Sequence, residues 1–316
     1  MLQVVQADLA KFGFEQRQGE QVLQAEDFSD NKSPLAGIRE VTREALKTAG
    51  TQGLKSLIIP VINSRPKEIA MDTLAKIMVA EARRHLSLKL YPTEITFALA
   101  DAEGVQAFQR VIERDKIVCL GDSITYGYPD GPDYSWVKLL AAATGLNLLN
   151  RGISGETTGQ MLARFNDDVV AEQPAYVIFA GGHNDGWMGV PLGEVEDNIR
   201  QVVEQAQQQG VCPILVLPAP LNVEQLLQNF QGTREEAEKY QAILQQIRNW
   251  IAQFAEASGI FALDFYSPLL GSDGQGLPHL LLDGGHPTHE GYQVLGEAAI
   301  QQLQGRLYFP NTSRSA

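Results

Sequence analysis

Two kinds of residue are scarce in this sequence: cysteine and, relative to the acidic residues, lysine and arginine. The only cysteines, Cys119 and Cys212, lie in apolar runs, which indicates buried thiols and excludes a disulfide framework or a cysteine-rich zinc site. Lysine and arginine number 25 against 38 aspartates and glutamates, a formal net charge of −13. An acidic surface repels phosphate backbones and anionic lipids, so we expect neither nucleic acid nor an anionic membrane as a partner.

Long apolar runs are also missing. No segment approaches the roughly eighteen apolar residues that a membrane-spanning helix needs, so we expect no stable membrane insertion. Residues 1–20 lack the basic start and apolar stretch of a signal peptide, which predicts a cytoplasmic protein. With 29 glycines and 15 prolines in 316 residues, the composition excludes collagen-like and wholly disordered chains.

Short apolar runs alternate with helix-period segments along the whole chain, which predicts parallel, doubly wound α/β sheets. The predicted strands are Leu2–Gln6, Leu54–Ile62, Glu94–Ala100, Lys116–Leu120, Leu146–Asn150, Tyr176–Ala180, Ile214–Leu217 and Ile260–Asp264. The clearest predicted helices are Lys67–His85, Trp136–Ala143, Glu194–Gln209 and Arg234–Ala257.

The length of 316 residues is enough for two domains, each with its own core. The strand that begins at Lys116 opens a self-contained α/β unit, so we place the boundary near Arg114. The sequence therefore predicts a smaller α/β domain over residues 1–114 and a larger one over residues 115–316.

A serine follows directly on one of the predicted buried strands. The run Ile117–Leu120 leads into Gly121, Asp122 and Ser123, which places the serine at the carboxyl edge of a sheet, where open parallel sheets hold their ligand sites. A serine there can act as a nucleophile while its N–H helps to hold an oxyanion. Alternatively, the turn simply caps the following helix. The common esterase pattern Gly-x-Ser-x-Gly does not surround Ser123.

A candidate base lies near the end of the chain. Of the five histidines, His286 follows Asp283 by three positions on a glycine-rich turn. That spacing lets the carboxylate accept the Nδ1–H of the imidazole and leaves Nε2 to take the serine proton. An aspartate and a histidine at this spacing also occur as ordinary helix caps. We expect His289, three residues further on, to face solvent in a first helical turn.

Oxyanion donors are available after two further strands. Asn184 follows the strand Tyr176–Ala180, and its side-chain amide can reach a developing oxyanion; as an alternative, it is a turn asparagine. Gly155 follows the strand Leu146–Asn150 and offers an unobstructed backbone N–H. The four strand-end turns thus supply, in order, a serine, a glycine amide, an asparagine and an Asp–His pair.

This order resembles the SGNH, or GDSL-type, serine hydrolase family. The matching blocks are Gly121-Asp122-Ser123, Gly155, Gly182-His183-Asn184-Asp185 and the pair Asp283 and His286, and the resemblance covers residues 116 to about 306. It implies a flavodoxin-like, three-layer α/β/α domain. It further implies Ser123 as nucleophile, His286 as base, Asp283 as its orienting acid, and an oxyanion hole of the Ser123 and Gly155 N–H groups and the Asn184 side chain. No metal or organic cofactor is implied.

The substrate is left open. The sequence Gly-His-Asn-Asp at 182–185 resembles acetylesterases that act on plant cell-wall sugars, whereas residues 153–157 look more like thioesterase and lysophospholipase members of the family. Trp187 and Met188 can wall an acyl pocket or pack on the sheet. Residues 218–233 and 277–282 also flank the site, and their leucines suit either an apolar acyl group or the core.

The front domain looks like a truncated macro domain. The runs Gly53–Ile62 and Thr93–Ala100 resemble its second half, and Asp8 matches the acid that contacts adenine in that family. The expected asparagine- and glycine-rich stretch is absent from residues 13–35, and the residues Asn63-Ser64-Arg65-Pro66 replace the diphosphate-binding glycine loop. Without those glycines the backbone cannot approach phosphates closely. We therefore expect no ADP-ribose binding and assign this domain a packing or oligomerisation role.

The sequence as a whole predicts a serine esterase that hydrolyses carboxylic esters of small or lipid-like molecules through an acyl-serine intermediate. Thioesterase, lysophospholipase and carbohydrate O-acetylesterase activities are alternatives within the same family. A metallohydrolase built on Asp283, His286 and His289 would leave Ser123 and Asn184 without a role. A non-enzymatic alternative is a nucleotide-ligand binding module in which the rear domain serves as scaffold.

Overall fold

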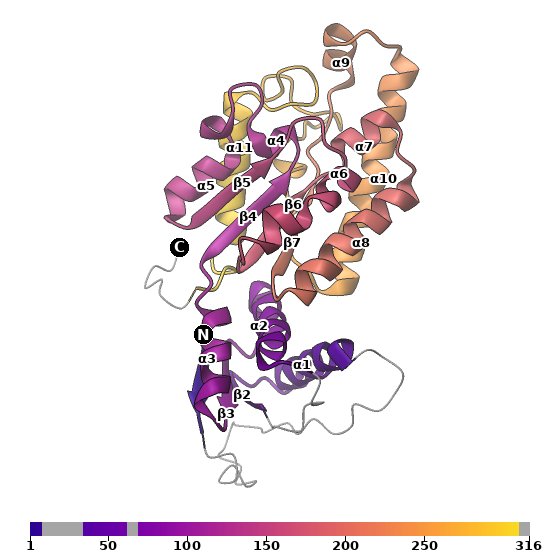
Figure 1. Ribbon diagram of the computed structural model, residues 1–316. Coiled ribbons are helices and arrows are strands. Elements are labelled where there is room, and N and C mark those ends of the chain that lie inside the picture. Colours follow the sequence, from indigo (N-terminus) through magenta and orange to yellow (C-terminus); the bar gives the residue numbers. More distant parts are fainter. Residues whose placement is uncertain (8–33, 62–68, 310–316) are drawn as a thin grey trace. The chain divides into compact units, whose positions relative to one another are not determined.

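The computed structural model describes residues 1–7, 34–61 and 69–309. The chain divides into two compact units (Figure 1). The first contains Met1–Asp115 together with Gln205–Cys212 and the segment from Gly305, and the second contains Lys116–Glu204 and Pro213–Gln304. A single cut in the sequence cannot represent the two later segments of the first unit, because Gln205–Cys212 interrupts the second unit along the chain and the segment from Gly305 follows it.

The first unit contains a three-stranded parallel sheet with the strand order β1-β3-β2. Its elements are β1 (Leu2–Gln6), α1 (Pro34–Thr51), β2 (Ser56–Val61), α2 (Met71–Ser87), β3 (Glu94–Leu99) and α3 (Ala102–Ile112). The core lies between the sheet and these helices; the rings of Phe97 and Phe108, for example, pack with their centroids 4.9 Å apart.

The features that would test a macro-like ligand site lie largely outside the described residues. These are Asp8, nearly all of residues 13–35, and the loop 63–66. The parallel sheet agrees with the predicted α/β character of this part of the chain. Its likeness to a macro domain stays a prediction.

The second unit contains a five-stranded sheet in the order β5-β4-β6-β7-β8. Numbered within this unit the order is 2-1-3-4-5, the flavodoxin-like arrangement. The strands are β4 (Lys116–Gly121), β5 (Asn147–Gly152), β6 (Tyr176–Ala180), β7 (Cys212–Leu217) and β8 (Ala262–Asp264). Strand β4 pairs in parallel with both β5 and β6, so the turns after these three strands share one edge of the sheet.

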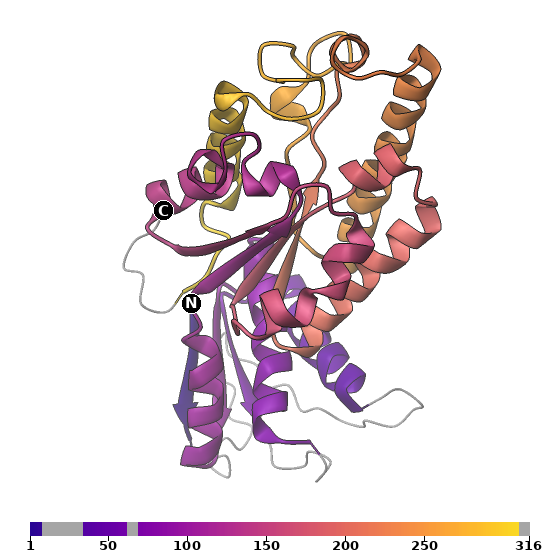
Figure 2. The ribbon, with the colours of Figure 1, turned by 45° about the horizontal axis from the view of Figure 1, so that its top comes forward.

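Helices cover both faces of this sheet, as Figures 1 and 2 show. Helices α5 and α11 pack together on one face, and α8 and α10 lie on the other. The helices are α4 (Ser123–Tyr126), α5 (Trp136–Thr144), α6 (Thr158–Ala163), α7 (His183–Met188), α8 (Leu192–Gln208), α9 (Val223–Asn229), α10 (Arg234–Ser258) and α11 (His289–Leu303). The predicted three-layer α/β/α architecture is therefore confirmed for this unit.

Local sequence explains where the longest helix begins and ends. Thr233 and Glu236 form a reciprocal capping box at the start of α10, and Gly259 adopts a left-handed conformation at its end. Ile260 N–H then donates to the Ala255 carbonyl over 2.8 Å and completes the helix end. Strand β8 consequently starts at Ala262, two residues later than predicted.

Most predicted elements coincide with observed ones within a few residues, because each amphipathic or apolar run faces a core. Strand β2 starts at Ser56 instead of Leu54, because the Leu54 N–H donates to the Ala49 carbonyl at the end of α1. Both cysteines are buried and unpaired, as predicted. Among the described helices, none combines the length and apolarity required to cross a membrane.

Candidate active site

Ser123 occupies the first position of α4, two residues after the end of the inner strand β4. Asp122 forms the N-cap, and its Oδ1 accepts a hydrogen bond from the Ile124 N–H over 3.0 Å. The first N–H groups of a helix have no acceptor within it, so the Ser123 N–H is available at this turn. The turn therefore combines the predicted cap with an accessible hydroxyl, and the two interpretations of the sequence are compatible.

His286 and Asp283 meet Ser123 in one chain of hydrogen bonds. Ser123 Oγ lies 3.0 Å from His286 Nε2, and His286 Nδ1 lies 2.8 Å from Asp283 Oδ2. Asp283 Oδ1 also accepts the main-chain N–H groups of His286 and Gly285 at 2.9 and 3.1 Å. Burial alone would raise the pKa of Asp283, but the hydrogen bonds from His286 and Gly285 outweigh it and hold the pKa below its usual range. An ionised Asp283 keeps the imidazole proton on Nδ1 and leaves Nε2 as an acceptor.

The turn that carries this pair is closed on itself and fixed to a neighbouring segment. The Leu282 N–H donates to the His286 carbonyl over 2.7 Å, and Asn222 N–H donates to the Gly284 carbonyl over 2.9 Å. Gly284 has a φ of +96°, and a Cβ there would come within 2.6 Å of the Leu226 nitrogen. Only glycine permits both this conformation and this close approach.

Two of the three predicted oxyanion donors lie together at the pocket, and the third lies on a neighbouring loop. Asn184, in the first turn of α7, lines the same pocket as Ser123 and His286. One N–H of its side chain donates to the Glu156 carbonyl over 2.9 Å, which leaves the second N–H for another acceptor. Gly155 is not part of the pocket lining; it has a φ of +86°, and its N–H donates to no acceptor within the described ranges.

A buried aspartate ties the asparagine turn to the preceding loop. Asp185 accepts hydrogen bonds from the N–H and the hydroxyl of Thr158, at the start of α6, over 3.0 and 2.6 Å. On the other side of the site, the Asn150 amide donates to the Thr125 carbonyl over 2.7 Å and so fixes the end of β5 to α4. These contacts keep the turns after β4, β5 and β6 in a fixed mutual arrangement.

His183 lies beside the site in a neutral form. Burial lowers the pKa of this imidazole to about 3, and its Nδ1 lies 3.0 Å from the Tyr240 hydroxyl of α10. The ring therefore anchors α7 to α10. His183 is not placed to act as the serine base, because His286 holds that position.

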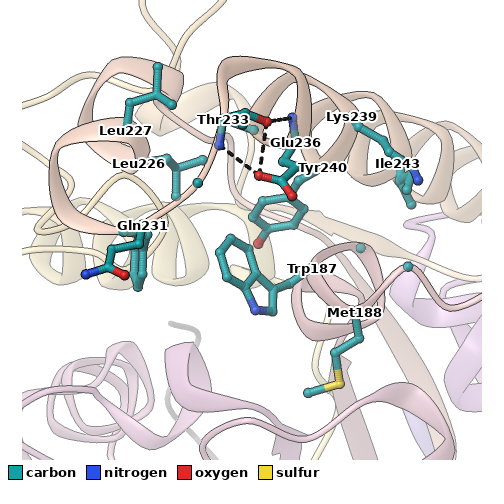
Figure 3. Close-up of a pocket in the computed structure, with 15 residues that line it drawn as sticks. Trp187, Met188, Leu226, Leu227, Gln231, Thr233, Glu236, Lys239, Tyr240 and Ile243 are labelled. Carbon is teal, nitrogen blue, oxygen red and sulfur yellow. Dashed lines mark hydrogen bonds between the residues drawn. The ribbon is translucent and has the colours of Figure 1, made fainter.

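A pocket of about 160 Å³ lies at the serine, and a second of about 310 Å³ adjoins it. The first is lined by Ser123, Ile124, His183, Asn184, Trp187, Leu226, Phe230, Tyr240, Asp283, Gly285 and His286. The two linings share Trp187, Leu226, Phe230 and Tyr240. Figure 3 shows the second pocket, where the Trp187 indole stands next to the Tyr240 ring and Leu226 and Leu227 project from α9.

Some of the residues predicted to flank the site line the pockets, and others are buried elsewhere. Trp187 and Met188 are 53% and 59% exposed and line the second pocket instead of packing on the sheet. The segment 218–233 contributes α9 and Phe230 to the pockets. Of the segment 277–282, Leu280 and Leu281 are buried, and none of its residues lines either pocket.

The predicted solvent-facing role of His289 is largely confirmed. Its ring is exposed, pairs with Asp130 over 2.6 Å and stacks on Tyr134. Within the described ranges, no three His, Cys, Asp or Glu side chains are grouped as a metal site would require. The metallohydrolase alternative, which needed Asp283, His286 and His289 together, has no geometric support.

Comparisons with known proteins found relatives named as thioesterases and esterases. The E. coli protein named thioesterase 1/protease 1/lysophospholipase L1 is 31% identical over 115 residues, which are 35% of this chain and 55% of that protein. An acetylxylan esterase of Geobacillus stearothermophilus is 24% identical over 216 residues, 60% of this chain and 94% of that protein. The chain spans about half the length of several curated relatives that it matches.

This chain is also similar to a solved structure of the same kind of protein. The structure described as a lipolytic protein of the G-D-S-L family from Desulfitobacterium hafniense has a TM-score of 0.52 and 32% identity, and the match covers 60% of this chain and 99% of that one. The model of the GDSL-like lipase/acylhydrolase family matches residues 119–294, more than half of the 316 residues. These residues include Ser123, Gly155, Asn184, Asp283 and His286, and the chain belongs to the GDSL-like lipase/acylhydrolase family.

Proposed function

We propose that this protein is a serine hydrolase that cleaves carboxylic esters through an acyl-serine intermediate. The observation that carries the proposal is the continuous hydrogen-bond chain from Ser123 through His286 to Asp283, at 3.0 and 2.8 Å. This is the arrangement in which a histidine removes a serine proton while a carboxylate orients it. Available N–H groups near Ser123 complete the requirements for acyl transfer.

In the acylation step, Ser123 Oγ attacks the ester carbonyl carbon while its proton passes to His286 Nε2. The carbonyl π pair moves to the oxygen, and we assign the stabilisation of this oxyanion to the N–H groups of Ser123 and Gly155 and the second N–H of Asn184. When the tetrahedral intermediate collapses, the bond to the leaving oxygen breaks. That oxygen takes the proton from Nε2 and departs as the alcohol.

In the deacylation step, water takes the place of the serine hydroxyl as the nucleophile. His286 Nε2 takes a proton from water as the water oxygen attacks the acyl carbon. The second tetrahedral intermediate then collapses with cleavage of the bond to Ser123 Oγ, which recovers the proton from Nε2. The acid is released, the enzyme returns to its starting state, and no cofactor enters the balance.

The lining of the two pockets supports an ester with an apolar substituent. The walls next to Ser123 are largely aromatic and aliphatic, formed by Trp187, Leu226, Phe230 and Tyr240, and such walls bind apolar groups by burial. The names of the relatives point to different substrates, a thioester or lysophospholipid and an acetylated xylan. We therefore propose esters of small or lipid-like molecules, with thioesters and acetylated sugars as competing substrates to be tested in the same panel.

The test is hydrolysis of p-nitrophenyl esters by the purified chain. We expect the wild type to release p-nitrophenol and the variant Ser123→Ala to lose at least about 10³-fold in kcat/KM, with an unchanged unfolding temperature. Ser272→Ala, at an exposed serine, is the matched control and should retain full activity. Full activity in Ser123→Ala would overturn the assignment of the nucleophile.

For the first unit we propose a truncated macro-like fold with a packing or oligomerisation role and no ADP-ribose binding. The replacement of the expected glycine loop by residues 63–66 supports this proposal. Calorimetry with ADP-ribose tests it, and micromolar binding would contradict it. The cytoplasmic location stays a prediction that cell fractionation would check.

A further inference from the structure

Arg164, the residue that follows α6, sits at a junction of the segments that carry the candidate oxyanion donors. Its Nη2 donates to the carbonyls of Gly121 and Arg151, over 3.1 and 2.9 Å. Its Nε donates to Glu156 over 2.6 Å, and its Nη1 donates to Asp168 over 2.5 Å. The guanidinium thus makes four hydrogen bonds with its five N–H groups.

Three of the four acceptors, Gly121, Arg151 and Glu156, belong to segments that lead to the candidate site residues. The Gly121 carbonyl ends β4, two residues before Ser123, and also accepts the Ile153 N–H over 3.0 Å. The Arg151 carbonyl lies at the end of β5, where the loop with Gly155 begins. Arg164 therefore ties the nucleophile turn directly to the loop that follows the neighbouring strand.

Glu156 connects the same guanidinium to the third donor. It follows Gly155 in the sequence, and its carbonyl accepts the Asn184 side chain over 2.9 Å. Since the Glu156 carboxylate is held by Arg164, the position of this carbonyl depends on the guanidinium. One side chain thereby connects the segments that carry Ser123, Gly155 and Asn184.

The charges around Arg164 indicate a positional role instead of a direct electrostatic one. Its side chain is 14% exposed and is paired with two carboxylates, Glu156 and Asp168. Asp168 also lies 3.7 Å from the guanidinium of Arg151, so two carboxylates balance two guanidinium groups and no net positive charge is left for an oxyanion. The planar guanidinium can serve four acceptors in fixed directions, which the single ammonium of lysine cannot.

We propose that Arg164 is a positioning residue that sets the geometry of the oxyanion hole through Gly121, Glu156 and Asn184. The inference rests on the proposed ester hydrolysis. It assigns to Arg164 no contact with substrate. Its effect is transmitted through the loop 153–157 and appears only where negative charge develops on the carbonyl oxygen.

The first experiment compares Arg164→Met and Arg164→Lys with the wild type on a p-nitrophenyl ester, after active-site titration. We expect kcat to fall roughly 10–100-fold in both variants, as for other residues that orient a catalytic group, with KM changed less than about threefold. The inhibition constant of a trifluoromethyl ketone, which forms a tetrahedral oxyanion on serine, should rise by the factor by which kcat/KM falls. The control is Arg200→Met, at an exposed arginine of α8 that pairs with Glu196 and Asp197. It should change neither kcat nor the inhibition constant.

The second experiment separates positioning from general damage to the fold. Combined with Asn184→Ala, the Arg164→Met substitution should cost at least threefold less in kcat than it does alone, because its main target is then absent. If Arg164→Met does not fold, Glu156→Ala removes the Arg164–Glu156 hydrogen bond instead. The loss in kcat that it causes should likewise be at least threefold smaller when Asn184→Ala is present. Equal losses in both backgrounds, or unchanged inhibitor affinity, would overturn the proposal. An inactive wild type would instead refute the ester hydrolysis itself.

Discussion

The ring of Tyr128 lies against the imidazole of His286, with centroids 4.5 Å apart and ring planes inclined by 43°. The same residue is tied to the nucleophile turn, because its N–H donates to the Ser123 carbonyl over 3.0 Å. Its own carbonyl accepts the Tyr292 hydroxyl over 3.0 Å. Tyr128 therefore packs against the imidazole whose Nε2 lies 3.0 Å from Ser123 Oγ, and it belongs to none of the four sequence blocks predicted to form the site.

Replacing Tyr128 by alanine should lower kcat by about 2–10-fold, because an aromatic pair contributes about 0.5–1.5 kcal/mol to the position of the imidazole. Tyr128→Phe keeps the ring and should retain wild-type kcat. Steady-state kinetics on a p-nitrophenyl ester would check both variants. If the two variants behaved alike, the ring contact would have no role in orienting His286.

We expect the negative charge of the Asp283 side chain to affect kcat far more than the size of that side chain does. Asp283→Asn preserves an oxygen for the main-chain N–H groups of Gly285 and His286 but no longer stabilises the Nδ1–H tautomer or the imidazolium. We expect kcat to fall by about 10²–10⁴-fold, as in related triads, with little change in unfolding temperature. Asp133→Asn, at an aspartate whose side chain is 85% exposed, is the control and should leave kcat unchanged.

Filling the second pocket should change the substrate preference. Leu227→Trp places an indole where Leu227 now lines the space shown in Figure 3. We expect the ratio of kcat/KM for an octanoyl over an acetyl p-nitrophenyl ester to fall about tenfold, since each buried methylene is worth about 0.8 kcal/mol. Gln228→Trp, at the adjacent exposed position outside the pocket lining, should leave the ratio unchanged. A constant ratio in Leu227→Trp would place the acyl chain elsewhere.

We expect Asp122 to make the stability of the protein depend on pH. Burial raises the pKa of this carboxyl from 3.8 to about 6, and the side chain is only 2% exposed. The stability that the protonated form contributes is fully present below about pH 3.8 and is lost as the pH rises through about 6.

The variant Asp122→Asn removes this titration and keeps an oxygen for the Ile124 N–H. Relative to the wild type it should gain stability as the pH rises from 4 to 7, by up to about 3 kcal/mol for a shift of roughly two pKa units. Thermal unfolding of both proteins across this range measures the difference. A difference that does not vary with pH would show that Asp122 has an ordinary pKa.

The sequence predicted that Ser123 and Asn184 follow strand ends, and the structure places them after β4 and β6, because the apolar runs of those strands are unambiguous. The spacing of Asp283 and His286 predicted a paired carboxylate and imidazole, and these groups lie 2.8 Å apart on a turn well beyond the end of β8. Sequence reasoning could not find Arg164 or Tyr128: an arginine after a short helix and a tyrosine in a loop carry no pattern, and their roles come from contacts with residues far along the chain. The Tyr240 hydroxyl that pairs with His183 lies 57 positions away, and only the packing of α10 brings it there.

The turn from Leu282 to His286 has a consequence for protein engineering. Its internal hydrogen bonds join Asp283 to His286 without help from the sheet, whereas the serine lies 163 positions earlier. The Asp283–His286 pair thus lies on a short turn that carries its own geometry, and its contacts to the rest of the unit include the bond from Asn222 at the start of α9 to the Gly284 carbonyl and the Tyr128 ring beside His286. Transplanting the pair into another α/β protein would require copying those contacts together with the five residues of the turn.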